Sequence, residues 1–206
     1  GRNILGDEEK LRHYTRHDIE TFISRNYATD RMVVSFVGEV PFSRVVRNFE
    51  HCFGSIVAKS SVQRSVASYD NHPAQKRLER KTFQAHCIIG NLAYPFSHDR
   101  RLALYLLNNY LGGPGMNSRL NLLLREKHGI TYNIEAVYNP YFETGNFSVY
   151  FGTDQANVDK SLTLIRKEIM GLCNHRLGSL QLSKARKQII GQMAMGAENH
   201  SSLMLS

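Results

Sequence analysis

"LGGPGMNSRLNLLLREKHGITYNIEAVYNPYFETGNFSVYFGTD" occupies residues 111–154 and decides the fold. Its leucine-rich middle predicts a helix whose inward face carries Leu120, Leu123 and Leu124. The runs TYNIEAVY and NFSVYFGT then alternate apolar and polar residues, as half-buried strands do. Because the connection NPYFETG contains a proline and a glycine that suit a chain reversal, the stretch predicts a helix followed by an antiparallel hairpin.

Further elements are predicted on both sides of this stretch. Before it, residues 78–95 alternate as a strand does, and residues 98–113 carry a helical pattern that ends at a glycine pair. After it, helices are predicted at about 156–175 and 179–200. His86 lies on the face of the predicted strand opposite to the apolar set, which favours a surface histidine over a metal ligand. That apolar set consists of Phe83, Ala85, Cys87 and Ile89.

The first quarter of the chain predicts a helix, a strand and a second helix. Thr15 is a candidate N-cap with Asp18 at the third helical position, so a helix of about 16–27 is expected. The apolar, β-branched run RMVVSFVGEV, residues 31–40, predicts a buried strand. PFSRVVRNFEHCFG, residues 41–54, has proline at its start and glycine at its end, as helices often do.

These elements predict an α+β fold, in which helices pack on a mostly antiparallel sheet as a two-layer sandwich. Residues 1–58 would be the remnant of a first subdomain made of a helix, a strand and a helix. The polar, serine-rich residues 59–76 would form a linker, and residues 77–206 a second α+β subdomain.

The composition is that of an ordinary soluble globular protein. The 206 residues are 42% hydrophobic and 21% charged, and no apolar run reaches the roughly 18 residues that span a bilayer. The formal net charge of +8 suits an acidic partner, but the basic residues are scattered and form no nucleic-acid-binding motif. We therefore expect no nucleic-acid partner and no membrane partner, and a nucleic-acid-binding module is the weaker alternative. Nothing in the sequence indicates the compartment.

One histidine pair has the spacing of a zinc site. HYTRH places His13 and His17 four residues apart, as in zinc peptidases. In the inverted frame H-x-x-E-H, however, Arg16 stands where the general-base glutamate is needed. With Thr15 as the helix cap, only His17 lies within the helix, so the two imidazoles need not share a face. The pair is therefore interpreted as surface histidines of a capping region.

Several motifs, taken in order, resemble one family. The sequence reads as a glycine-rich turn, SRL, a leucine-rich helix, REK.G..Y, a hairpin with TG.F, and then GT. This order resembles the insulinase or pitrilysin-type zinc metallopeptidases, which include the mitochondrial processing peptidase and non-catalytic relatives. Residues 3–40 resemble the family segment that begins just after the metal-binding region. The matching positions are Gly112, Gly113, Gly115, 118–120, 125–129 with Tyr132, 144–147 and 152–153.

The resemblance implies where the chemistry of the family lies. The family's zinc is held by an H-x-x-E-H motif and a further glutamate, all upstream of the segment with which this sequence begins. We therefore expect no metal ligand and no catalytic residue in this chain, and zinc in a full-length parent. As a fragment, the chain would neither bind zinc at the family site nor cleave peptides alone.

The resemblance also implies two substrate-binding residues, Arg125 and Tyr132. In the family, an arginine and a tyrosine at this spacing reach the substrate from the half of the enzyme that faces the zinc half. Both side chains can donate hydrogen bonds to a peptide carbonyl, which strengthen as negative charge develops on its oxygen. The alternative is that Arg125 pairs with a surface carboxylate and Tyr132 packs in the sheet.

The leading hypothesis is that the chain is part of a zinc-dependent endopeptidase acting on peptides or protein segments. It would supply substrate-binding and structural parts without a metal site. The alternative is a non-catalytic subunit or half of the same fold that scaffolds a catalytic partner. In both cases the expected partners are a peptide or protein substrate and a second homologous half, a subunit or a homodimer mate.

Overall fold

The computed structural model describes residues 4–61 and 72–205. The chain divides into two compact units, of which the first comprises residues 1–65 with 196–206 and the second comprises residues 66–195. Each unit is described by itself. Of the predicted linker, residues 59–76, the central part lies outside the described residues, so the predicted domain boundaries stay a prediction.

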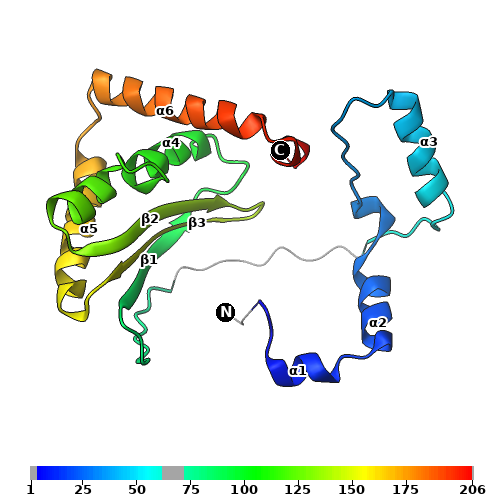
Figure 1. Cartoon of the computed structure of the whole chain (residues 1–206), viewed down its shortest axis with the longest axis horizontal. Coiled ribbons are helices and arrows are strands. Elements are labelled where there is room, and N and C mark those ends of the chain that lie inside the picture. The colour runs from blue at the N-terminus through cyan, green and yellow to red at the C-terminus, as the bar shows by residue number, and fades with distance from the viewer. Residues whose placement is uncertain (1–3, 62–71, 206) are drawn as a thin grey trace. The chain divides into compact units, whose positions relative to one another are not determined.

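The second unit is built on a three-stranded antiparallel sheet with the order β1-β3-β2 (Figure 1). The strands are β1 (Ala85–Ala93), β2 (Thr131–Pro140) and β3 (Gly145–Thr153). The predicted hairpin is confirmed, since β2 and β3 pair in antiparallel register from Thr131↔Thr153 to Pro140↔Gly145. The alternation predicted in β1 also holds from position 85 onward, with Ala85, Cys87 and Ile89 half-buried and His86 exposed.

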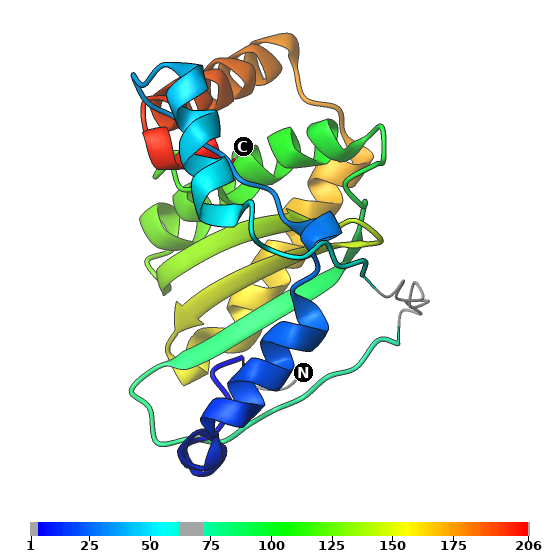
Figure 2. The same cartoon turned by 90° about the vertical axis from the view of Figure 1, so that its right-hand side faces the viewer.

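Helices cover one face of this sheet (Figure 2). They are α4 (Arg101–Gly112), the π-helix η2 (Asn121–Lys127) and α5 (Val158–Asn174). All three contribute to a single apolar cluster with β2 and β3, which confirms the α+β two-layer sandwich. The buried members of the cluster are Leu111, Leu120, Leu124, Ile134, Ala136, Val149, Phe151 and Ile165.

The leucine-rich segment forms the predicted helix, but its backbone hydrogen bonds span five residues where those of an α-helix span four. Leu120 and Leu124 are fully buried, as their spacing predicts. Over Asn121–Lys127 the backbone is π-helical, and the His128 amide donates to the carbonyl of Leu123, five residues earlier, at 3.2 Å. Gly129 then turns the chain into β2 with a φ of 60°, a left-handed value that glycine adopts at little cost.

The end of α4 lies unusually close to β2. A Cβ added at Gly112 would lie 2.7 Å from the Cβ of Ala136 and 2.8 Å from its amide nitrogen. No side chain fits in that space without a shift of the backbone. The second glycine of the predicted helix stop, Gly113, is the C-cap of α4.

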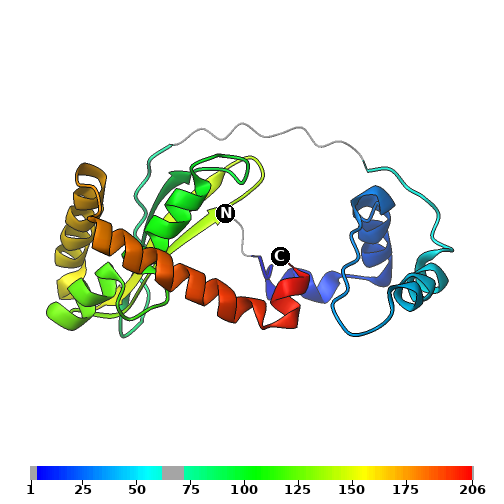
Figure 3. The same cartoon turned by 90° about the horizontal axis from the view of Figure 1, so that it is seen from above.

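A further helix, α6 (Ser179–Ala197), runs across the outer side of α4 (Figures 1 and 3). Ala185 is its buried residue. The side-chain amides of Asn117 and Gln188 exchange hydrogen bonds of 3.1 and 3.3 Å, which tie α6 to the glycine-rich turn after α4. The helix predicted at 179–200 ends at Ala197, slightly earlier than expected. A short helix, α7 (His200–Met204), follows it.

The first unit contains α1 (Glu8–His13), α2 (Arg16–Asn26), a 3-10 turn η1 (Thr29–Arg31) and α3 (Phe42–Phe53). The predicted cap of α2 is confirmed, because Thr15 and Asp18 form a reciprocal capping box. The helix predicted from the proline and glycine at 41–54 is also confirmed as α3.

The buried strand predicted for residues 31–40 is wrong. The segment after η1 has no strand, and most of its apolar side chains are substantially exposed, with Val33 at 88%. A β-branched run becomes a strand only where a neighbouring strand completes its hydrogen-bond ladder. In the described part of the chain, the only sheet is the three-stranded one of the second unit. Residues 4–58 therefore contain helices joined by an extended segment, not a helix, a strand and a helix.

The close approach at Gly112 gives a stability prediction with a matched control. We expect Gly112→Ala to lower the free energy of unfolding by about 1–3 kcal/mol, because the new methyl group would push α4 away from β2. Gly191→Ala in α6 meets no atom within 4 Å and should raise stability by about 0.5–1 kcal/mol through helix propensity. Urea denaturation followed by circular dichroism measures both changes. Equal effects of the two substitutions would contradict the packing at Gly112.

Candidate functional site

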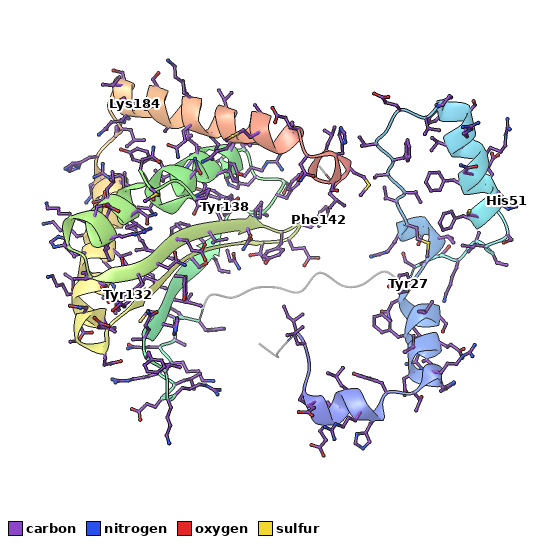
Figure 4. The ribbon with its side chains drawn as sticks, viewed as in Figure 1. Tyr27, His51, Tyr132, Tyr138, Phe142 and Lys184 are labelled. Carbon is purple, nitrogen blue, oxygen red and sulfur yellow. The ribbon has the colours of Figure 1, made fainter. Side chains whose placement is uncertain are left out.

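Tyr132 lies at the beginning of β2, where the strand departs from regular pairing. Thr131 pairs with Thr153 and Asn133 with Gly152, so Tyr132 is the extra residue of a bulge. The residue is 57% exposed, and its hydroxyl donates to Oδ1 of Asp154 at 3.0 Å. Figure 4 shows Tyr132 at one end of the sheet, with Phe142 at the hairpin turn at the other end.

Asp154 shifts the pKa of this phenol. The hydrogen bond to the carboxylate, together with its negative charge, raises the pKa of Tyr132 above the usual value of 10.0. A tyrosine hydroxyl is protonated at neutral pH, so that of Tyr132 is a hydrogen-bond donor. A ligand that accepts this hydrogen bond has to compete with Asp154.

Arg125 lies near the end of η2, and its side chain is about half exposed. Its nearest carboxylate is that of its neighbour Glu126, with Nε 3.9 Å from Oε1, which is too long for a hydrogen bond. The carbonyl of Arg125 accepts a hydrogen bond of 3.1 Å from the amide of Gly129, so its helical turn is tied to the turn that leads into β2. The guanidinium is therefore left largely available to another acceptor.

The structure thus places both predicted residues on the surface, on either side of one short turn. No hydrogen bond joins Arg125 to Tyr132 in the described part of the chain. Tyr132 differs from a tyrosine that packs in the sheet, such as Tyr138. The ring of Tyr138 is buried, and its hydroxyl donates to the carbonyl of Tyr94 at 2.7 Å. The role of the two residues stays a prediction.

The sheet carries a second polar contact, between His86 and Tyr150, which was not predicted from the sequence. His86 of β1 and Tyr150 of β3 face away from the helices, and Nδ1 of the imidazole lies 2.8 Å from the phenol oxygen. Their rings are stacked with centroids 6.1 Å apart. The prediction of a surface or satisfied histidine at position 86 is confirmed, whereas its partner depends on a β1–β3 register that the sequence does not reveal.

The histidines of HYTRH do not form a donor set for zinc. His13 ends α1, and its Nδ1 lies 2.6 Å from the carbonyl oxygen of Glu9. His17 is in the first turn of α2, with Nε2 3.5 Å from the hydroxyl of Thr21. Across residues 4–61 and 72–205, no three His, Cys, Asp or Glu side chains are grouped so that they could hold a metal ion. These residues do not fit the zinc that the resemblance implies for a parent protein.

A membrane-spanning helix needs about 20 predominantly apolar residues. None of the helices in the described ranges is both long enough and apolar enough to cross a bilayer.

Comparisons with known proteins point to one family. Residues 13–189 match the family model described as "Peptidase M16 inactive domain". An uncharacterized zinc protease of Streptomyces coelicolor is 31% identical over 215 residues, which cover 99% of this chain and 46% of that protein. An uncharacterized zinc protease of Bacillus subtilis is 28% identical over 204 residues, which cover 99% of this chain and 49% of that protein. The chain therefore spans about half the length of the curated relatives it matches.

Solved structures share the fold. The crystal structure of a peptidase M16 inactive domain from Pseudomonas fluorescens matches with a TM-score of 0.76 at 21% identity, over 90% of this chain and 45% of that chain. A protease from Helicobacter pylori matches with the same TM-score of 0.76 at 18% identity, over 97% of this chain and 49% of that chain. With the family model covering most of its length, the chain belongs to the M16, or insulinase-type, family of peptidases, and it matches that family's inactive domain.

Proposed function

We propose that this chain is the non-catalytic, substrate-contacting part of a zinc-dependent endopeptidase that acts on peptides or protein segments. The match of residues 13–189 to the inactive domain of the M16 family carries this proposal. The names of the relatives as zinc proteases support a zinc enzyme as the parent. The metal would be held by residues other than those described in this chain.

In this proposal, Arg125 and Tyr132 bind the backbone of the substrate. A guanidinium and a neutral phenol can each donate to a peptide carbonyl oxygen, and both side chains are exposed at the turn between η2 and β2. A donor that meets developing negative charge typically lowers a reaction barrier by about 3 kcal/mol. The hydrogen bond from Tyr132 to Asp154 supports the role, because the exposed hydroxyl already acts as a donor there.

The sheet offers a second kind of contact. β2 is an outer strand of the β1-β3-β2 sheet, and Tyr132 lies at its beginning. An extended peptide that adds to an outer strand gains main-chain hydrogen bonds, which tolerate varied side chains. We propose that the substrate runs along β2, so that the same segment reaches the donor hydroxyl of Tyr132.

The alternative is that the chain is a non-catalytic subunit or half that scaffolds a catalytic partner. The first unit favours it, because α2 and the segment after η1 expose apolar side chains such as Ile19, Phe22 and Val33. An exposed apolar surface of this kind is typical of a contact with another protein surface. The partner would be a second homologous half, a subunit or a homodimer mate. An intact H-x-x-E-H motif with its downstream glutamate in the parent favours the enzyme, and degenerate ligands favour the scaffold.

Tyr132 provides a titration test of the proposed donor. Asp154→Asn should lower the pKa of Tyr132 toward its usual value, because the negative charge that opposes deprotonation is removed. The sign follows from the raised pKa: the hydrogen bond is intact at neutral pH and is lost as the pH rises through that pKa. NMR of 13C-labelled tyrosine measures the shift. Glu143→Gln, at the hairpin turn, serves as the control, and an unchanged Tyr132 in the Asp154 variant would contradict the contact.

The kinetic test uses the assembled enzyme, in which this chain is combined with the metal-bearing remainder of the protein. Arg125→Ala and Tyr132→Phe should each lower kcat/KM for a fluorogenic peptide by about a hundredfold, as loss of one oxyanion-type donor does. Thermal melting of the variants should match the wild type, since both side chains are exposed. Unchanged kinetics in both variants would remove the proposed roles.

Metal analysis tests the other part of the proposal. The purified chain, after dialysis against a zinc-containing buffer and gel filtration, should hold no stoichiometric zinc by atomic emission. The reason is that its described histidines, cysteines and carboxylates form no ligand group. One tightly held zinc ion per chain would contradict the proposal, and loss of that ion in His13→Ala would identify HYTRH as its site.

A further inference from the structure

A cavity of about 500 Å³ lies on the helical side of the second unit. Its walls come from η2, from α5 and from the connection between α5 and α6, which Figure 1 shows beside one another. Neither Arg125 nor Tyr132 lines it, so the cavity is separate from the proposed substrate contacts. Its inner wall is apolar, with Leu123, Leu164 and Leu172 packing against the core of the unit.

The remaining wall of the cavity is strongly basic. Lys127, Lys167 and Arg176 line it, and none of the three forms an ion pair within the described ranges. The only carboxylate in the lining, Glu168, already accepts a hydrogen bond from Nε of Arg119. The single negative charge is therefore compensated, and the three free cations leave the cavity with an excess of positive charge. Two histidines, at positions 128 and 175, and the amide side chain of Gln181 also line it.

We infer that this cavity binds a small anionic ligand with an apolar body, of the kind that a medium-chain carboxylate represents. The leucines would contact the apolar body, and the cations would contact the carboxylate. The volume lies in the range of about 300–1,000 Å³ that small-molecule sites occupy.

Gly171 offers a way to close the cavity without disturbing the fold. It lies in α5 and lines the cavity, and a Cβ added there would meet no atom within 4 Å. Gly171→Phe would therefore place a ring in the cavity from a position where helix propensity favours the substitution. Gly191→Phe is the matched control, because Gly191 is also a helical glycine with open space around it but lies outside the cavity lining.

The first experiment titrates the full chain with sodium decanoate below its micelle concentration and follows backbone amides by NMR. We expect saturable shifts centred on Gly171 and its cavity neighbours in the wild type and in Gly191→Phe. In Gly171→Phe these shifts should be lost while the thermal melt is unchanged. Binding that is the same in Gly171→Phe and wild type would overturn the inference.

The second experiment separates charge from apolar contact. Lys127→Gln and Lys167→Gln should each weaken decanoate binding about fivefold, the order expected of one solvent-screened ion pair. Lys184, which Figure 4 labels in α6, does not line the cavity. Lys184→Gln should therefore have no effect on decanoate binding. Decanol, which lacks the charge, and acetate, which lacks the apolar body, should both bind at least about tenfold more weakly than decanoate. Equal binding of decanol, or tighter binding of an acidic peptide than of decanoate, would overturn the proposed ligand class.

Discussion

At Gly112 the last turn of α4 meets β2, and the only side chain at this contact is the methyl group of Ala136. This contact sets how near the helices can come to the sheet. At that spacing Leu111 of α4 and Leu124 of η2 join Phe151 of β3 in one cluster. Burying a side chain of this kind contributes about 1.5–3 kcal/mol, so the cluster is the main source of stability in the second unit. A larger residue at position 112 would weaken all of these contacts together.

The same core supports two local irregularities beside the candidate site. The π-helical register of η2 and the bulge at Tyr132 lie on either side of the turn at Gly129. Each costs regular hydrogen bonding, and both kinds of irregularity are common near functional sites. Leu124 anchors η2 and Ile134 anchors β2 in the core, so the exposed residues between these anchors are held in place. The candidate site thus consists of exposed side chains on a fixed frame.

Local patterns predicted much of this frame. The leucine spacing of η2 and the alternation of β2 and β3 are properties of neighbouring residues, and so they are readable from the sequence. The contact of Tyr132 with Asp154 and that of His86 with Tyr150 depend on strand register, which the pattern leaves undetermined.

The basic cavity could not be predicted for a related reason. Its lining residues are spread from Arg119 and η2 through α5 and the following connection to the first turn of α6, and only the folded chain brings them together. A scattered basic composition and a concentrated basic cavity look the same in the sequence. The strand predicted at 31–40 was wrong for a different reason. Its local pattern is strong, but the described residues contain no neighbouring strand with which it pairs.

The contrast between the two units bears on the proposed partner. In residues 4–61 the only buried residue is Ala28, although α2 and α3 both carry apolar side chains. A segment that buries so little apolar surface gains too little free energy to offset the entropy of ordering its backbone. Its helices therefore need an apolar surface supplied from elsewhere. In the scaffolding role proposed above, a second homologous half, a subunit or a homodimer mate would supply this surface.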